Sequence, residues 1–272
     1  MSVERKFIEG SYTPTADDEN NVGYFVKGVA TKMVELSGGL LELASVVRDT
    51  TSRYCAYYVI KGTNAAIYVG TTSSYSRLEI AAAAKTGEDT FINLGSTVYF
   101  NTNRSAPVDI NLGVLGNFFC CVRLTHNGNT MNAYAAWGTG SALNDETLVF
   151  GYVDSGRAFS DYSASSICVA KQGDTSYTNC NLGEKTLNIK SYEIAANNCT
   201  YALCCYSKYA WSSSLYPGYV KWGGLYDMYV LCNAGAEFKV TMGRKYILDG
   251  KDYVATNEYL LIPVIAGTTT IA

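Results

Sequence analysis

The side chains that could carry out acid–base chemistry are few and scattered. The 272-residue chain contains a single histidine, His126, beside an Asn-Gly pair that predicts a hairpin turn. Because histidine-based triads and histidine-rich metal sites need more partners, we interpret His126 as a solvated turn residue. The acidic clusters at 17–19, 88–89 and 145–146 fit a helix start or turns. The sequence therefore predicts no catalytic residue, with a glycosidase-like carboxylate pair from distant positions left open as an alternative.

The cysteines are the other reactive side chains. Nine is an odd number, and most lie in strand-like runs such as FFCCVRL and YALCCYS, which is typical of buried, reduced thiols. Adjacent cysteines point to opposite faces of a strand, and no C-x-x-C spacing occurs, so the pattern does not indicate a metal site. We predict structural thiols, with no metal and no cofactor. The cysteines are Cys55, Cys120, Cys121, Cys168, Cys180, Cys199, Cys204, Cys205 and Cys232.

Sequence motifs for nucleotide and hydrolase chemistry are also missing. The glycines form neither G-x-G-x-x-G nor G-x-x-x-x-G-K-[ST], and G-x-S-x-G does not occur. A net charge of −3 gives no electrostatic reason to bind nucleic acid or an anionic membrane. We therefore predict that the protein is not an enzyme and binds neither nucleic acid nor membrane.

The stretch from Tyr206 to Cys232 has the highest density of aromatic rings, with six tyrosines and two tryptophans in 27 residues. Tyr216, Tyr219 and Trp222 surround Pro-Gly and Gly-Gly turns, where rings are harder to bury than on flanking strands. Tyrosine and tryptophan supply rigid contact area with a polar group at the tip. These three residues are therefore the candidate binding residues, for a protein interface or a glycan.

The elements around these residues are predicted to be mostly strands. Twenty-three tyrosines, 25 glycines and four prolines suit pleated surfaces joined by tight turns. One amphipathic helix is predicted from the acidic residues at 17–19 to Gly38, because apolar residues from Val22 to Val34 recur at three- and four-residue spacing. Gly23 and Gly28 weaken this helix, so we expect it to pack against a sheet.

From residue 40 onward, apolar runs separated by turn residues predict a β meander. The segment 77–85, RLEIAAAAK, is ambiguous, because its alanines favour a helix while its length and neighbours allow a strand. The predicted strands are 40–47, 54–60, 65–71, 97–101, 118–125, 130–137, 147–153, 166–171 and 186–194, followed by hairpins between 237 and 264.

These elements predict a mainly β fold, a β-sandwich or barrel-like meander with one N-terminal amphipathic helix, and α+β as the alternative. Residues 1–16 are expected to form an extended arm and 17–272 a single β-rich domain, with a subdivision near 154–200 as an alternative. No apolar run approaches the roughly 20 residues of a membrane helix, and the start MSVERKFIEG is charged where a signal peptide is apolar. We expect a protein that stays in the cytoplasm.

The layout resembles bacteriophage virion proteins, chiefly tail and baseplate components. The resemblance lies in the helix leading to YCAYYVIKGTNAAIYVGTT, in FFCCVRLTHNGNTMNAYAAWG, in SLYPGYVKWGG and in the ending GRKYILDGKDYVATNEYLLIPV. It implies a multi-copy structural subunit of the virion, assembled in the host cytoplasm, whose partners are copies of itself and other virion proteins. The alternative is a carbohydrate- or receptor-binding module at a tail tip, with Tyr216, Tyr219 and Trp222 stacked on sugar rings.

Overall fold

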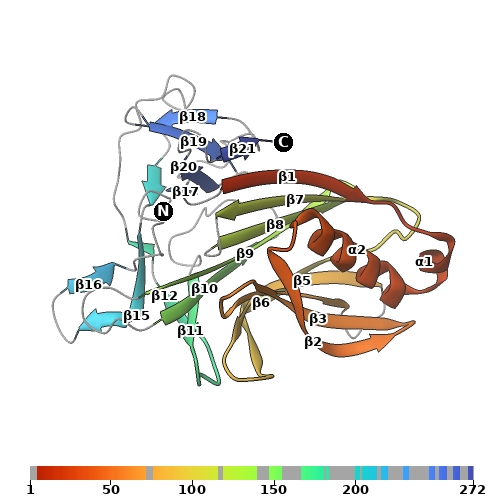
Figure 1. Ribbon diagram of the computed structural model, residues 1–272, viewed down its shortest axis with the longest axis horizontal. Coiled ribbons are helices and arrows are strands. Elements are labelled where there is room, and N and C mark those ends of the chain that lie inside the picture. Colours follow the sequence, from red (N-terminus) through yellow and green to blue (C-terminus); the bar gives the residue numbers. More distant parts are fainter. Residues whose placement is uncertain are drawn as a thin grey trace.

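The computed structural model describes residues 5–71, 76–115, 119–139, 147–154 and 167–180, together with short strands farther along the chain. The described residues are mostly strands, with two helices near the N-terminus (Figure 1). The prediction of a mainly β fold with a sandwich-like meander is therefore confirmed.

The larger sheet, sheet A, has eight strands in the order β12-β11-β10-β9-β8-β7-β1-β21. Neighbours are antiparallel except β1 and β21, which are parallel. The strands are β1 (Arg5–Tyr12), β7 (Val108–Leu115), β8 (Phe119–His126), β9 (Asn129–Thr139), β10 (Thr147–Asp154), β11 (Ile167–Lys171), β12 (Thr178–Cys180) and β21 (Thr269–Ile271).

Sheet B is a five-stranded antiparallel meander in the order β2-β3-β4-β5-β6, as the apolar runs and turns predicted. The ambiguous segment RLEIAAAAK is a strand, β5. The strands are β2 (Leu41–Thr50), β3 (Arg53–Ile60), β4 (Ala65–Thr71), β5 (Arg77–Lys85) and β6 (Phe91–Asn101).

Two smaller sheets contain the remaining described strands. The predicted strand 186–194 lies outside the described residues. One sheet comprises β13 (Leu182–Gly183), β15 (Cys204–Ser212) and β16 (Tyr216–Tyr219). The other comprises β14 (Thr200–Ala202), β17 (Tyr229–Cys232), β18 (Lys245–Leu248), β19 (Lys251–Ala255) and β20 (Leu260–Pro263).

The main hydrophobic core lies between sheets A and B, which pack face to face. The two sheets come closest where β10 crosses β5. A Cβ atom on Gly151 of β10 would lie 2.6 Å from the Cβ of Ala82 and 2.7 Å from Leu94. Small residues at this crossing let the sheets approach, which explains why a strand of sheet B is rich in alanine.

Helix α2 (Val22–Leu36) fills the open side of this sandwich (Figure 1). It packs against β2, β3 and β4 of sheet B and against β1 and β7 of sheet A. Its apolar stripe is almost completely buried, which confirms that the helix is held by packing against sheets. The buried apolar residues of α2 are Val22, Phe25, Val26, Val29, Ala30 and Met33.

The helical region begins with a separate short helix, α1 (Ala16–Asn20), where the sequence predicted one continuous helix. Asn21 between them has an extended backbone, and its Nδ2 donates to the carbonyl oxygen of Asp17 at 2.9 Å. In the first turn of α1, the buried Asp18 carboxylate accepts from Thr15 N at 2.6 Å and from the Tyr12 hydroxyl at 2.6 Å. These bonds fix the entry into the helices.

The first strand differs from the extended arm expected over residues 1–16. Residues Arg5–Tyr12 form β1, which pairs with β7 along its whole length. Phe7 is buried, and Ile8 and Tyr12 pack against the main core. The pairing with β7 makes this segment a strand of sheet A, and its apolar side chains lie on both faces of that sheet.

The interpretation of His126 as a solvated turn residue is wrong. The Asn-Gly hairpin turn is present, with positive φ at Asn127 and Gly128, but His126 is buried at the end of β8. Its Nδ1 donates to the carbonyl oxygen of Pro107 at 2.9 Å, and its Nε2 accepts from the backbone N–H of Asn103 at 2.8 Å. His126 is therefore a structural residue that holds the β6–β7 connection.

Candidate assembly surface

Strand β2 is the edge of sheet B. It pairs with β3 on one side, and none of the other described strands pairs with its far edge. Figure 1 shows β2 at the lower margin of the molecule. An edge strand exposes a row of backbone N–H and C=O groups that can pair with another chain.

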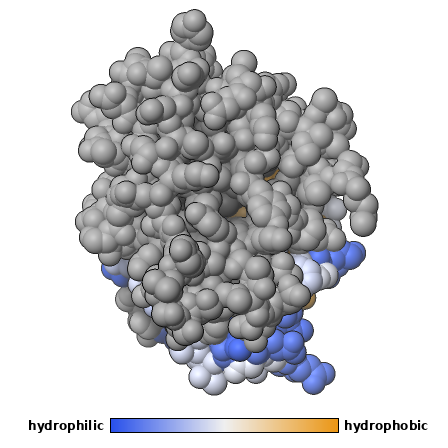
Figure 2. Space-filling model, turned by 90° about the vertical axis from the view of Figure 1, so that its left-hand side faces the viewer, coloured by the Kyte–Doolittle hydropathy of each residue, from blue (hydrophilic) through white to orange (hydrophobic). Residues whose placement is uncertain are grey.

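Three apolar side chains are exposed on this strand, and we call them the β2 patch: Leu43, Val46 and Val47. Their exposed fractions are 54%, 46% and 62%. Of the six large hydrophobic residues that are exposed among the described residues, these three belong to one strand. The described residues visible at the lower edge of Figure 2 range from hydrophilic to intermediate in hydropathy. Exposed apolar groups that gather on an edge strand indicate a contact surface.

Two irregularities interrupt the pairing of β2 with β3. The register shifts between Leu43 and Ser45 and again between Val46 and Arg48, so that Ala44 and Val47 are extra residues on β2. Leu43 and Val46 lie opposite Tyr58 and Ala56, both core residues, yet both side chains remain exposed at the sheet edge. The bulges thus break the alternation of buried and exposed positions.

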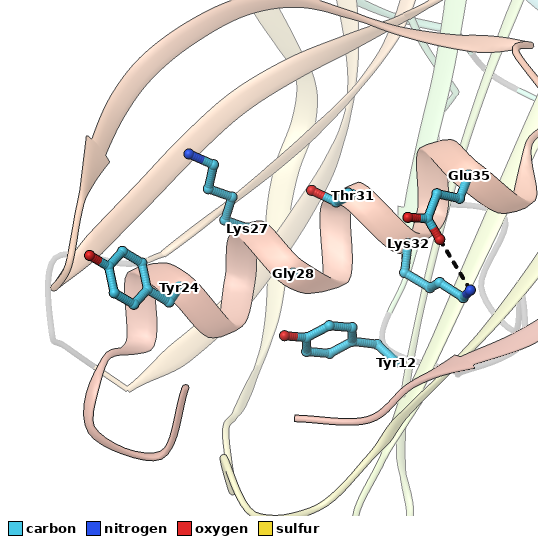
Figure 3. Close-up of a pocket in the computed structure, with 7 residues that line it drawn as sticks. All are labelled: Tyr12, Tyr24, Lys27, Gly28, Thr31, Lys32 and Glu35. Carbon is cyan, nitrogen blue, oxygen red and sulfur yellow. Dashed lines mark hydrogen bonds and ion pairs between the residues drawn. The ribbon is translucent and has the colours of Figure 1, made fainter. Parts of the chain in front are cut away.

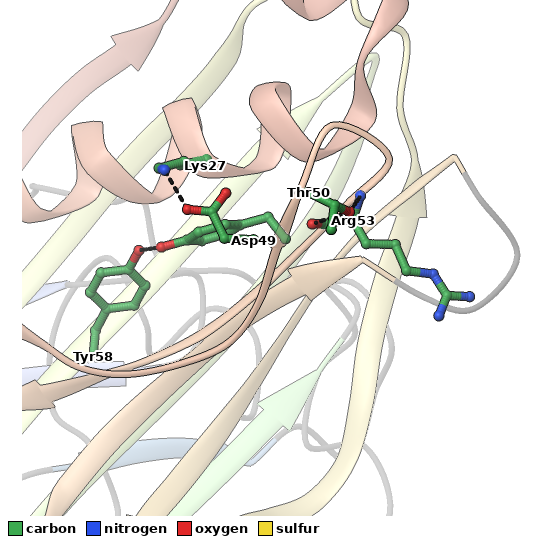
Figure 4. Close-up of polar contacts among 6 residues, drawn as sticks. Lys27, Asp49, Thr50, Arg53 and Tyr58 are labelled. Atoms are coloured by element: carbon green, nitrogen blue, oxygen red, sulfur yellow. Dashed lines mark hydrogen bonds and ion pairs between the residues drawn. The ribbon is translucent and has the colours of Figure 1, made fainter.

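Ion pairs lie next to the β2 patch. Lys27 of α2 binds Asp49 with Nζ and Oδ2 2.6 Å apart (Figure 4), and Lys61 binds Glu42 at 3.2 Å. All four side chains are well exposed, so each pair contributes little to stability. Their effect is to place charged groups of both signs around the apolar patch, as in the rim of an interface.

A hollow of about 390 Å³ lies along the outer side of α2 (Figure 3). Lys32 pairs with Glu35 at 3.1 Å, and Lys27 with Asp49, so both lysines of the hollow already have acidic partners. The Tyr12 ring packs on Gly28, where a Cβ would overlap it. The lining therefore indicates helix packing and not a charged ligand site. It consists of Tyr12, Tyr24, Lys27, Gly28, Thr31, Lys32 and Glu35.

The outer face of sheet B carries a second, smaller hydrophobic cluster. The rings of Tyr57 and Phe91 stack with centroids 4.6 Å apart, and Tyr57 lies 5.2 Å from Tyr68. These aromatic residues pack around Ala81 and Ala83 of β5, which are fully buried. The alanines of β5 are thus enclosed on both faces of the sheet, by rings outside and by sheet A inside.

Replacing Glu79 by glutamine tests the electrostatics of this face. The Tyr68 hydroxyl donates to Glu79 Oε1 at 2.9 Å, and burial raises the pKa of the Glu79 carboxyl. As the pH rises from below the ordinary carboxyl pKa of about 4.3 through this raised pKa, the folded state acquires a half-buried charge and loses stability. Glutamine keeps the acceptor without the charge. We expect Glu79→Gln to gain stability over wild type progressively with pH in thermal unfolding.

A matched substitution controls for the general effect of removing a carboxylate. Glu88 is exposed, so Glu88→Gln should change the melting temperature only slightly. A constant difference between Glu79→Gln and wild type from pH 3.5 to 8 would contradict the assignment.

The predicted binding residues lie in the less described part of the chain. Tyr216 and Tyr219 are the first and last residues of β16, which pairs with β15. The side chains of both, and all of Trp222, lie outside the described residues. Their role stays a prediction. The β2 patch was missed, although the neighbouring apolar residues Val46-Val47 in LASVVRDT are a departure from strand alternation that could have indicated it.

Four cysteines have side chains that the structure describes, and none of these four forms a disulfide with another of them. Cys120, Cys121 and Cys168 are buried and Cys55 is partly buried. Burial raises the pKa of the Cys168 thiol to about 11, which makes it unreactive at neutral pH. Within the described part of the chain, no cluster of three His, Cys, Asp or Glu residues could hold a metal ion.

The helices that the structure describes are too short or too polar to cross a membrane. Comparison with known proteins gives no assignment: no protein-family model matches the chain, and no curated protein is significantly similar to it.

Proposed function

We propose that the protein is a non-enzymatic structural subunit that assembles with copies of itself into a symmetric oligomer. The β2 patch is the observation that carries this proposal, because Leu43, Val46 and Val47 are exposed together on a strand edge that no other described strand pairs with. The phage setting follows from the resemblance in layout to tail and baseplate components. In that setting the subunit forms part of the virion, is assembled in the host cytoplasm, and contacts other virion proteins.

The size of the β2 patch suggests a weak individual contact. Fully burying a valine or leucine side chain contributes about 1.5–3 kcal/mol, and these side chains are already about half buried. Six such side chains across a contact between two protomers would contribute roughly 6 kcal/mol, against an association cost of about 4–15 kcal/mol. Assembly should therefore depend on protein concentration and on further contacts within a particle.

Introducing a charge into the β2 patch tests the proposal. Val47→Lys places an ammonium group where an apolar contact is proposed, so we expect self-association at least tenfold weaker than in wild type, because an unpaired charge is costly to bury. Sedimentation velocity and light scattering over a range of concentrations measure this. Tyr177→Lys is the matched control, since Tyr177 is also exposed but lies outside β2 and should leave assembly unchanged.

Two results would contradict the proposal. A wild-type protein that remains monomeric at millimolar concentration would remove assembly as the function. Equal weakening by Val47→Lys and Tyr177→Lys would indicate a general effect of added charge and not a contact through β2.

A further inference from the structure

Strand β2 is complementary to itself when it is read in the opposite direction. Counted along the ladder with β3, without the bulged residues Ala44 and Val47, Leu43 and Val46 stand one pairing position on either side of Ser45. Glu42 and Arg48 stand two positions on either side. A second β2 strand placed antiparallel and centred on Ser45 therefore sets each Glu42 beside an Arg48, and each Leu43 beside a Val46. Opposite charges and apolar pairs in directly facing positions both stabilise an antiparallel ladder.

The faces of the sheet agree with this pairing. Glu42 and Arg48 lie opposite Val59 and Cys55 of β3, which pack with the aromatic cluster on the outer face of sheet B. A two-fold axis perpendicular to a sheet keeps outer faces together, so the Glu42 and Arg48 side chains of two copies meet on the same face.

We propose that two copies of the chain join β2 to β2 across a two-fold axis at Ser45, which makes one continuous sheet from two copies of sheet B. This inference rests on the proposed function, because it specifies how the subunit assembles. The partner is a second copy and not another protein because the charges and apolar residues of this edge match its own sequence in reverse.

The local charges permit this arrangement. Asp49 is already paired with Lys27 of the same protomer, so it does not compete for Arg48. The Glu42–Lys61 pair is exposed and weak, and a carboxylate can accept from both Lys61 and a facing arginine. A two-fold contact also uses the same edge of both copies and leaves neither free, so the assembly closes instead of growing into a fibre.

A charge-reversal series on the full-length chain tests the pairing. Glu42→Arg and Arg48→Glu each place like charges opposite one another twice per dimer, so each should weaken dimerisation about tenfold. The double variant Glu42→Arg with Arg48→Glu restores opposite charges and should return within about threefold of wild type. Lys61→Gln is the control, because it removes the Lys61–Glu42 pair inside the protomer and should leave the dimer unchanged.

A cross-link locates the axis independently. In an antiparallel ladder centred on Ser45, the two copies of this residue face each other with Cα atoms about 4.5–5.5 Å apart, a separation that a disulfide spans. Ser45→Cys should form a covalent dimer under mild oxidation, over the background of the native cysteines. Thr50→Cys at the end of the strand should not, because its distance from its own copy is too large.

The outcomes separate this inference from the function on which it rests. Failure of the double variant to restore dimerisation, or no cross-link at Ser45, overturns the two-fold pairing even if Val47→Lys abolishes assembly. In that case β2 remains a contact surface with another geometry. If the wild type does not self-associate at all, both the pairing and the proposed function are overturned.

Discussion

Replacement of Phe25 by alanine is expected to lower the free energy of unfolding by about 3–5 kcal/mol. Phe25 is fully buried on α2, where the helix fills the space between sheets A and B. Its ring lies 6.1 Å from that of Tyr12 and 5.9 Å from that of His126, measured between centroids. These neighbours belong to β1 and β8, which are held by their own ladders and cannot move to fill a cavity.

Chemical denaturation monitored by circular dichroism measures this loss, with the adjacent Tyr24 as control. Tyr24 is exposed on the outer side of α2, so Tyr24→Ala should change stability by less than about 1 kcal/mol. Similar losses for the two variants would mean that α2 does not bury its apolar stripe between the sheets. A smaller loss for Phe25→Ala alone would mean that the sandwich can close over the cavity.

Part of this fold could be predicted because local patterns and tertiary packing agree. The three- and four-residue spacing of Val22, Phe25, Val26 and Val29 predicted α2, and the same residues are its buried stripe. The turns after β3 and β8 were predicted from Lys-Gly and Asn-Gly pairs, which need positive φ. In these places the chain's local preference is also the native conformation, so the sequence alone was sufficient.

Other elements depend on contacts that a single sequence does not show. The alanines of β5 favour a helix locally, but sheet A on one side and aromatic rings on the other require small side chains in a strand there. His126 looks like a turn residue, and only the fold brings Pro107 and Asn103 to its two ring nitrogens. The strand β1 was expected to be an arm because residues 1–16 are polar and show no period, and its partner β7 lies about 100 residues away, where no local pattern indicates the pairing.

The candidate site, too, depends on features that a single sequence does not show. Aromatic density selected Tyr216, Tyr219 and Trp222, but density does not distinguish a contact surface from packing. The β2 patch consists of ordinary valines and a leucine, and such residues become informative only when their exposure is known. The adjacent valines Val46-Val47 indicate an irregular strand, but the exposure also depends on the position of β2 at the sheet edge, which has no sequence signature of its own.

Substitution of Gly23 by alanine is expected to destabilise the protein by about 3 kcal/mol, although a glycine-to-alanine change inside a helix normally stabilises by about 1 kcal/mol. Gly23 lies in the first turn of α2, where its N–H donates to the carbonyl oxygen of Thr51 at 2.9 Å. A Cβ atom here would overlap the carbonyl oxygen of Thr50 and lie 2.8 Å from Arg53 N. Both are backbone atoms, so no side chain can move to relieve the overlap.

Helix propensity alone predicts that Gly23→Ala stabilises the protein, whereas the overlap with Thr50 predicts that it destabilises it. The sign of the measured change in unfolding free energy therefore distinguishes the two effects. Thr31→Ala, an exposed substitution in the same helix, should stabilise by a few tenths of a kcal/mol from helix propensity. If Gly23→Ala also stabilises in thermal and denaturant unfolding, the close approach between α2 and the β2–β3 turn is absent in solution.

Gly23→Ala also connects the helix to the proposed assembly. The turn that the new methyl group would displace joins the end of β2 to β3, so its displacement changes the course of the β2 edge. We therefore expect Gly23→Ala to weaken self-association at temperatures where the variant remains folded, whereas Phe25→Ala, which acts in the core, should weaken it only as far as it unfolds the protein. Sedimentation velocity at 10 °C on both variants separates the two effects. Equal assembly of folded Gly23→Ala and wild type would mean that the position of β2 does not depend on α2.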